Sequence, residues 1–191
     1  MAYDPPVAVY DACVLYPFHL RNLLVQCAVD RLIAARWTEE VHDEWIRNLS
    51  KDNANLSAER LKRTRDLMNG VLPDADVKDY KKHIETVHLP DPDDRHLVAA
   101  GISARASLIV TWNTAHFPDG ELVKHGLKRR TPDELLIELY NARQDMVVAA
   151  TANARRNLTK SGISPRDFLE ALDRQRAHRF VDAMKPHIAD I

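Results

Sequence analysis

The segment from residue 89 to residue 118 constrains the fold most, because it joins an acidic helix start to a buried strand. Its first residues include three carboxylates, Asp91, Asp93 and Asp94. Asp91 is a favourable N-cap, and Pro92 suits the first position of a helix. The apolar residues of 97–104 recur with helical spacing, and the β-branched run 107–112 then predicts a short buried strand. This strand is followed directly by the polar side chain of Asn113.

A second predicted strand also ends in a polar side chain. The apolar run Val7–Tyr10 leads directly into Asp11. Ligands of open α/β sheets bind outside the carboxyl ends of the strands, so two parallel neighbouring strands would place Asp11 and Asn113 in one crevice. Compensation of the helix dipole, worth ~0.3–1 kcal/mol per acid, would explain each carboxylate near Asp91. One capping acid is enough there, so we interpret the three acids and Asp11 as one shared acidic site.

The order of the predicted elements favours a parallel α/β sheet. Strand-like and helix-like segments alternate from Val7 to Tyr140, which is typical of this class. Thr38 is a good N-cap for one of the helices, on which Glu44 borders the apolar stripe of Val41 and Trp45. Taken alone, Glu44 would be interpreted as a solvated side chain.

The end of the chain has a different pattern. Residues 143–191 show helix starts and apolar residues at helical spacing, but no strand pattern. With 191 residues, 45% of them hydrophobic, the chain has room for one domain of ordinary size and an appendage. We therefore predict a sheet domain over residues 1–142 and a helical C-terminal extension over residues 143–191.

Composition and motifs argue against several classes of protein. The two cysteines, Cys13 and Cys27, lack the spacing of a metal site, and the motifs of nucleotide-binding loops, zinc proteases and serine hydrolases do not occur. No signal-peptide pattern and no apolar run of membrane-spanning length are found, so we expect a cytoplasmic protein with no membrane contact. Because the net charge is −1, binding to nucleic acid would depend on local basic patches such as residues 60–65.

Four motifs follow one another along the chain: VYDACVLYP, WTEEVHDEWIRNL, DPDDRHLVAAG and LIVTWNTAHFP. In this order they resemble the PIN-domain ribonucleases, and most closely the VapC-like toxins of bacterial toxin–antitoxin pairs. The resemblance covers residues 5–142 and implies a three-layer α/β/α domain with a parallel central sheet. It also implies an RNA substrate, a small antitoxin as the protein partner and Mg²⁺ or Mn²⁺ as the cofactor, and it leaves a homodimer open.

The resemblance also implies a set of site residues. Carried over by position, the catalytic residues are Asp11, Glu44, Asp94 and Asn113. Asp11 and Asp94 would be the direct metal ligands, and the supporting residues would be Thr111, Asp93 and His116. Magnesium is usually held in proteins by one or two carboxylates together with water, which this set can provide.

Two positions depart from the family pattern. Asn113 stands where many relatives have Asp, and His116 stands where close relatives often have a further Asp. The sequence therefore leaves two functions open. The first is a metal-dependent endoribonuclease that acts as a toxin, and the second is a catalytically weakened RNA- or protein-binding module on the same fold.

Overall fold

The computed structural model describes residues 3–191, and a four-stranded parallel sheet lies at its centre. The strands are β1 (Val7–Tyr10), β2 (Ala34–Arg36), β3 (Leu108–Val110) and β4 (Lys128–Arg130), in the order β2-β1-β3-β4. In the register of the sheet, Val9 on β1 lies opposite Arg36 on one side and Ile109 on the other. The predicted parallel sheet is confirmed, and β1 and β3 are neighbours as expected.

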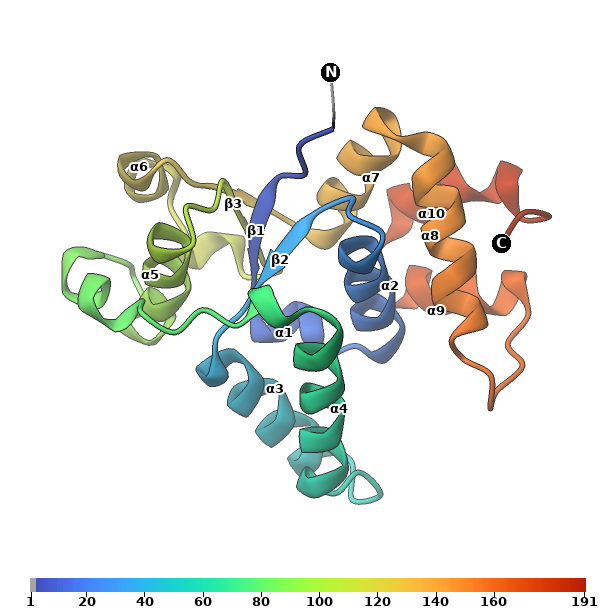
Figure 1. Cartoon of the computed structure of the whole chain (residues 1–191), viewed down its shortest axis with the longest axis horizontal. Helices are drawn as coiled ribbons and strands as arrows, with labels where there is room; N and C mark the ends of the chain where they lie inside the picture. Colours follow the sequence, from blue (N-terminus) through green and yellow to red (C-terminus); the bar gives the residue numbers. More distant parts are fainter. Residues whose placement is uncertain (1–2) are drawn as a thin grey trace.

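Helices cover both faces of this sheet (Figure 1). On one side, α5 (Arg95–Ser103) packs against β1 and β3, whereas α2 (Phe18–Val29) and α7 (Pro132–Ala142) lie on the other side. Parallel strands between two helical layers are buried on both faces, which explains why β1 and β3 are continuous apolar runs. The predicted three-layer α/β/α architecture is confirmed.

The sequence pattern does not predict the edge strand β2. Residues 34–36 are two alanines and an arginine, which have little preference for strands. They become a strand because α2 returns the chain to the edge of β1, where the backbone amide of Ala34 donates to the carbonyl of Pro6 at 2.9 Å. Tertiary pairing therefore decides the conformation of this segment.

Helices α3 (Glu39–Asp52) and α4 (Ala58–Val71) form a hairpin at the bottom of the view in Figure 1. The Thr38 hydroxyl accepts a hydrogen bond from the Val41 amide at 3.2 Å, which confirms the predicted start of α3. Trp45 is fully buried on the inner face of α3, and this fixes the helix against the sheet domain. Glu44 is therefore held beside the buried face of α3.

Short 3₁₀ turns connect α4 to α5: η1 (Pro73–Ala75), η2 (Lys81–Thr86) and η3 (Pro92–Asp94). Asp91 caps the last of them, because its side chain accepts a hydrogen bond from the Asp93 amide at 3.0 Å. The predicted N-cap role of Asp91 is thus confirmed, although α5 itself begins only at Arg95.

Three short helical turns join β3 to β4: η4 (Thr114–His116), α6 (Asp119–Leu122) and η5 (Val123–His125). Gly126 ends this segment with a φ of 71°, in the left-handed region that favours glycine. The buried Glu121 carboxylate accepts hydrogen bonds from the His88 amide at 3.0 Å and from Lys124 Nζ at 2.6 Å. Glu121 therefore ties α6 to the segment that precedes α5.

The C-terminal extension is helical, as predicted. Its elements are α8 (Gln144–Arg156), α9 (Pro165–Arg174), α10 (His178–Met184) and η6 (Lys185–His187). α8 packs along α2 and α10 packs on α7, so the extension lies outside the helical layer that these two helices form (Figure 1). The exact boundary at residues 142 and 143 stays a prediction. Within residues 3–191, no helix has the length and apolar character that crossing a membrane requires.

Candidate active site at the carboxyl edge of the sheet

Asp11 and Thr111 meet where β1 and β3 end. The Asp11 amide donates to the carbonyl of Val110 at 3.0 Å, which extends the pairing of the strands to the site. The Thr111 hydroxyl donates to Asp11 Oδ2 at 2.5 Å, and both side chains are buried. Asp11 is also the N-cap of the short helix α1 (Ala12–Leu15). The position of its carboxylate is thus fixed by two neighbouring elements.

Cys13 is a further contact of Asp11, and its sequence pattern did not predict it as a residue of the site. Its thiol lies 3.1 Å from Asp11 Oδ2 and 3.5 Å from the Thr111 hydroxyl. Burial, and after it the charge of Asp11, raises the pKa of the Cys13 thiol to about 12. The thiol therefore stays protonated and donates to Asp11. Its place two residues after Asp11, at the start of a helix, was the only signal in the sequence.

Asp94 enters the site from the start of α5 and pairs with His116. His116 Nδ1 lies 2.7 Å from Asp94 Oδ2. Asp94 precedes β3 in the sequence, and His116 follows it. Burial raises the pKa of the Asp94 carboxyl, the hydrogen bond from His116 opposes this, and the charge of Asp11 raises it further. The structure therefore brings the predicted residues Asp94 and His116 into direct contact.

Glu44 lies within electrostatic range of the other two acids. It is half-buried, and burial is the largest cause of the raised pKa of its carboxyl. The charges of Asp11 and Asp94 raise this pKa further, whereas Arg47 lowers it. Three carboxylates thus lie within electrostatic range of one another at the edge of the sheet, and the charge of Asp11 makes ionisation of both Glu44 and Asp94 less favourable.

Asn113 and Asp93 are the most open of the predicted residues, because both are exposed. The backbone amide of Asn113 donates to the Thr111 hydroxyl at 2.9 Å, which ties Asn113 to the end of β3. Asp93 is part of the η3 turn, and its charge adds to the raised pKa of Glu44. Both residues therefore border the three acids.

His96 is a buried histidine next to the acids. Burial lowers the pKa of its imidazole, and the charges of Glu40, Asp11 and Asp94 oppose this. Its Nδ1 is buried without a hydrogen-bond partner among the described residues. His42, another histidine of this half of the chain, instead accepts a hydrogen bond from Trp45 at 2.9 Å.

The donor atoms of the site fit a hard divalent cation, because carboxylate oxygens predominate and they repel one another in the absence of a cation. Asp91, Asp94 and His116 each place one ligand atom within 4.8 Å of the others. Within residues 3–191, Asp11 belongs to no such group. The structure thus places Asp94 in a ligand cluster, and Asp11 lies close enough for its charge to raise the pKa of the Asp94 carboxyl.

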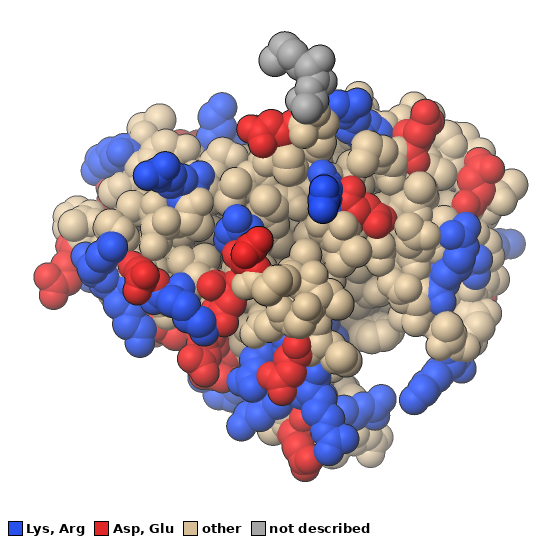
Figure 2. Space-filling model, in the orientation of Figure 1, with Lys and Arg blue, Asp and Glu red and all other residues tan. Residues whose placement is uncertain are grey.

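Basic side chains gather on the hairpin of α3 and α4. Figure 2 shows many of them at the bottom of the view, over α3 and α4. Some are neutralised locally, as in the exposed pair of Arg63 with Glu59 at 2.9 Å. Within the described chain, Arg60 and Lys62 form no ion pair, so the predicted basic patch keeps free positive charge.

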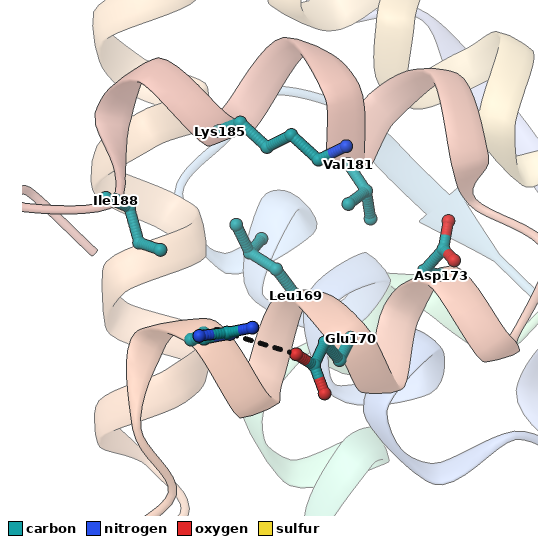
Figure 3. A pocket seen from close by; sticks show the side chains of 7 residues that line it. Leu169, Glu170, Asp173, Val181, Lys185 and Ile188 are labelled. Atoms are coloured by element: carbon teal, nitrogen blue, oxygen red, sulfur yellow. Dashed lines mark hydrogen bonds and ion pairs between the residues drawn. The ribbon is translucent and has the colours of Figure 1, made fainter.

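A separate hollow lies in the C-terminal extension, between α9 and α10 (Figure 3). Its volume is about 490 Å³, and Leu169 and Val181 form its apolar floor. At its rim, Arg166 pairs with Glu170 at 3.1 Å. None of the predicted site residues lines this hollow, and its charges are paired locally. We therefore place the candidate active site at the sheet and not here.

Comparison with known proteins identifies the family. The model of the PIN domain family matches residues 7–115, which is more than half of the chain. The chain therefore belongs to the PIN domain family, and the predicted resemblance to VapC-like PIN domains is confirmed. A second family model, the VapC50 C-terminal domain, matches residues 132–186.

A curated relative carries the name "Putative ribonuclease VapC50" and comes from Mycobacterium tuberculosis. It is 32% identical over 82 residues, which is 43% of this chain and 48% of that protein. The chain thus spans about half the length of the curated relative it matches. No solved structure matches this chain.

Proposed function

We propose that this chain is a metal-dependent endoribonuclease and the toxin of a toxin–antitoxin pair. The observation that carries the proposal is the convergence of Asp11, Glu44 and Asp94, whose charges raise the pKa values of the Glu44 and Asp94 carboxyls. A cation bound among them would offset this repulsion. Membership of the PIN domain family and the name of the curated relative support RNA as the substrate.

Each residue of the site has a role in this proposal. Asp11 and Asp94 would hold Mg²⁺ or Mn²⁺ with carboxylate oxygens, and Glu44 would accept hydrogen bonds from water bound there. A metal ion at such a site lowers the pKa of a bound water and stabilises charge on the reacting phosphate. Thr111 orients Asp11, and Asn113 presents an exposed amide that can donate to a phosphate oxygen.

The proposal is tested by cleavage of RNA with magnesium, with manganese and with EDTA. Changes of residues that only support metal ligands typically reduce activity ~10–100-fold. We expect Asp11→Asn and Asp94→Asn to reduce the rate of RNA cleavage by more than this. Asp43→Asn is the matched control, because it removes an exposed acid on α3 next to Glu44. Wild-type rates for both site variants would show that the site is assigned to the wrong residues.

The toxin role is tested separately, in cells. Expression of the wild-type chain should slow growth, expression of Asp11→Asn should not, and a small inhibitory partner should restore growth. If a chain that cleaves RNA in vitro is harmless at high expression, the toxin role is wrong and the nuclease activity stands.

The pairing of Asp94 with His116 favours a second function. His116 Nδ1 lies 2.7 Å from Asp94 Oδ2, so this carboxylate oxygen forms a hydrogen bond with His116 and is less available to bind a metal ion. A catalytically weakened RNA- or protein-binding module would show this arrangement, and it would bind without cleaving. Cleavage that requires magnesium and Asp11 would exclude this alternative.

A further inference from the structure

The connection between α9 and α10 is anchored to the sheet domain by two side chains. Gln175 Oε1 accepts a hydrogen bond from the Leu20 amide at 2.8 Å, in the first turn of α2. Asp133, in the first turn of α7, accepts a hydrogen bond from the Phe180 amide at 2.9 Å. α7 begins directly after β4, and α2 follows β1 and α1, so both anchors lie near the carboxyl ends of the strands.

Arg176 lies between Gln175 and Phe180 in the chain and has a left-handed backbone conformation. Its φ is 71°, in the left-handed region that is unfavourable for a residue with a Cβ atom. Its amide donates to the carbonyl of Asp173 at 2.9 Å, and its side chain is exposed. This conformation ends α9, because the Ala177 amide also donates to the carbonyl of Leu172, and the two bonds form the usual left-handed cap of a helix.

The Arg176 guanidinium stacks on a residue of the active-site edge. Its Cζ atom lies 4.4 Å from the ring centroid of Trp112, which is the geometry of a cation–π contact. Trp112 follows Thr111 and precedes Asn113 in the chain, and its amide donates to the Cys13 thiol at 3.3 Å. Trp112 thus belongs to the end of β3 that carries the predicted site residues.

The charge of Arg176 is free for a ligand. Within residues 3–191, no carboxylate forms an ion pair with its guanidinium. A guanidinium that stacks by its face keeps the N–H groups of its edge available, and these bind phosphate oxygens in pairs. The acids of the site repel an RNA backbone, so a cation beside them is needed to hold the phosphates.

We propose that Arg176, stacked on Trp112, is an RNA-binding residue that the C-terminal extension contributes to the active site of the PIN domain. This proposal rests on the proposed ribonuclease function. Arg176 binds a phosphate group next to the reacting one and does not take part in the chemical step. The extension is then part of the substrate-binding site and not only a cover for α2 and α7.

The test measures RNA binding in EDTA, where cleavage does not interfere. The probe is a short fluorescein-labelled single-stranded RNA of mixed sequence, followed by fluorescence anisotropy over a range of salt concentrations. Arg176→Gly should weaken binding roughly tenfold, as expected for one charged hydrogen-bonding contact. The slope of log K against log salt should fall by ~0.7, which corresponds to one phosphate contact on a single strand. Arg176→Lys should recover the slope but only part of the affinity.

Stability and kinetics separate this role from a structural one. Glycine tolerates positive φ, so Arg176→Gly should unfold at the wild-type temperature or above it. In magnesium, the variant should raise KM while kcat changes little. The matched control is Arg166→Ala, which removes the same charge at the opposite end of α9 and should bind RNA like the wild type.

Three results would overturn the proposal. In the first, the wild-type chain binds and cleaves RNA, and Arg176→Gly binds RNA with the same affinity. This would exclude Arg176 as an RNA-binding residue and leave the ribonuclease function intact. In the second, Arg166→Ala loses as much RNA affinity as Arg176→Gly. This would show that only the net charge of the protein matters and not the position of Arg176. A lower unfolding temperature of Arg176→Gly in proportion to its loss of binding would make the residue structural. A wild-type chain that neither binds nor cleaves RNA would instead refute the ribonuclease function itself.

Discussion

The hydroxyl of Thr111 lies 2.5 Å from Oδ2 of Asp11, although the two residues are 100 positions apart in the sequence. Both side chains are buried, and a hydrogen bond to a carboxylate is stronger than one between neutral groups. The contact exists because β1 and β3 are parallel neighbours that end at the same edge of the sheet. It holds the central acid of the candidate site in one orientation.

Replacing Thr111 by Val should therefore reduce both stability and activity. The change keeps the shape of the side chain but leaves Asp11 without its strongest donor, at a cost of ~1.5–3 kcal/mol. Urea unfolding gives the change in stability, and RNA cleavage with magnesium gives the change in rate. Thr111→Ser keeps the hydroxyl and is the control. A Val variant as stable and as active as the Ser variant would contradict the importance of this hydrogen bond.

Replacing Asn113 by Asp should keep or increase RNA cleavage. It adds a fourth carboxylate at the end of β3, which should lower the concentration of magnesium needed for half-maximal activity. The measurement is a magnesium titration of the cleavage rate, with Asn113→Ala as the control. Complete loss of activity in the Asp variant would show that the amide of Asn113 has a role of its own.

Replacing Asp94 by Asn should raise the unfolding temperature in EDTA. The pKa of the Asp94 carboxyl is raised in the folded protein, so its ionised form at neutral pH opposes folding. The wild type should be stabilised by a metal ion, by ~2.7 kcal/mol at a hundred times the dissociation constant, and the variant much less. Thermal unfolding with EDTA and with excess manganese measures both effects. If the variant is less stable in EDTA and neither protein responds to metal, Asp94 only supports the start of its helix.

Replacing Glu121 by Gln should destabilise the protein at neutral pH but not at low pH. The hydrogen bond from Lys124 and that from the His88 amide lower the pKa of the Glu121 carboxyl to about 2. The usual value is about 4.3, so this contribution to stability is complete above that pH and is lost as the pH falls towards 2. The expected loss at pH 7 is ~1–3 kcal/mol, since a buried polar contact is weakened.

Urea unfolding of the wild type and of Glu121→Gln between pH 7 and pH 2 tests this prediction. The two stabilities should converge as the pH falls. A difference that is the same at every pH would show that the charge of Glu121 does not stabilise the fold. RNA cleavage at neutral pH should be similar in both proteins, because Glu121 lies outside the site.

Local patterns in the sequence were sufficient for much of the fold. Helix starts at Thr38 and Asp91 depend on a side chain and on amides two or three residues away, so they can be predicted from the sequence. The continuous apolar runs of β1 and β3 predicted buried parallel strands, because such strands face helices on both sides. Their ends then placed Asp11 and Asn113 at one edge of the sheet.

Other features were decided by the tertiary structure alone. β2 is a strand because β1 lies beside it, and Glu44 comes near Asp11 because Trp45 fixes the rotation of α3. The pairing of His116 with Asp94 and the stacking of Arg176 on Trp112 join segments whose own sequences show no preference for these contacts. Local preferences act over a few residues, whereas these contacts arise only when packing of the whole core brings distant segments together.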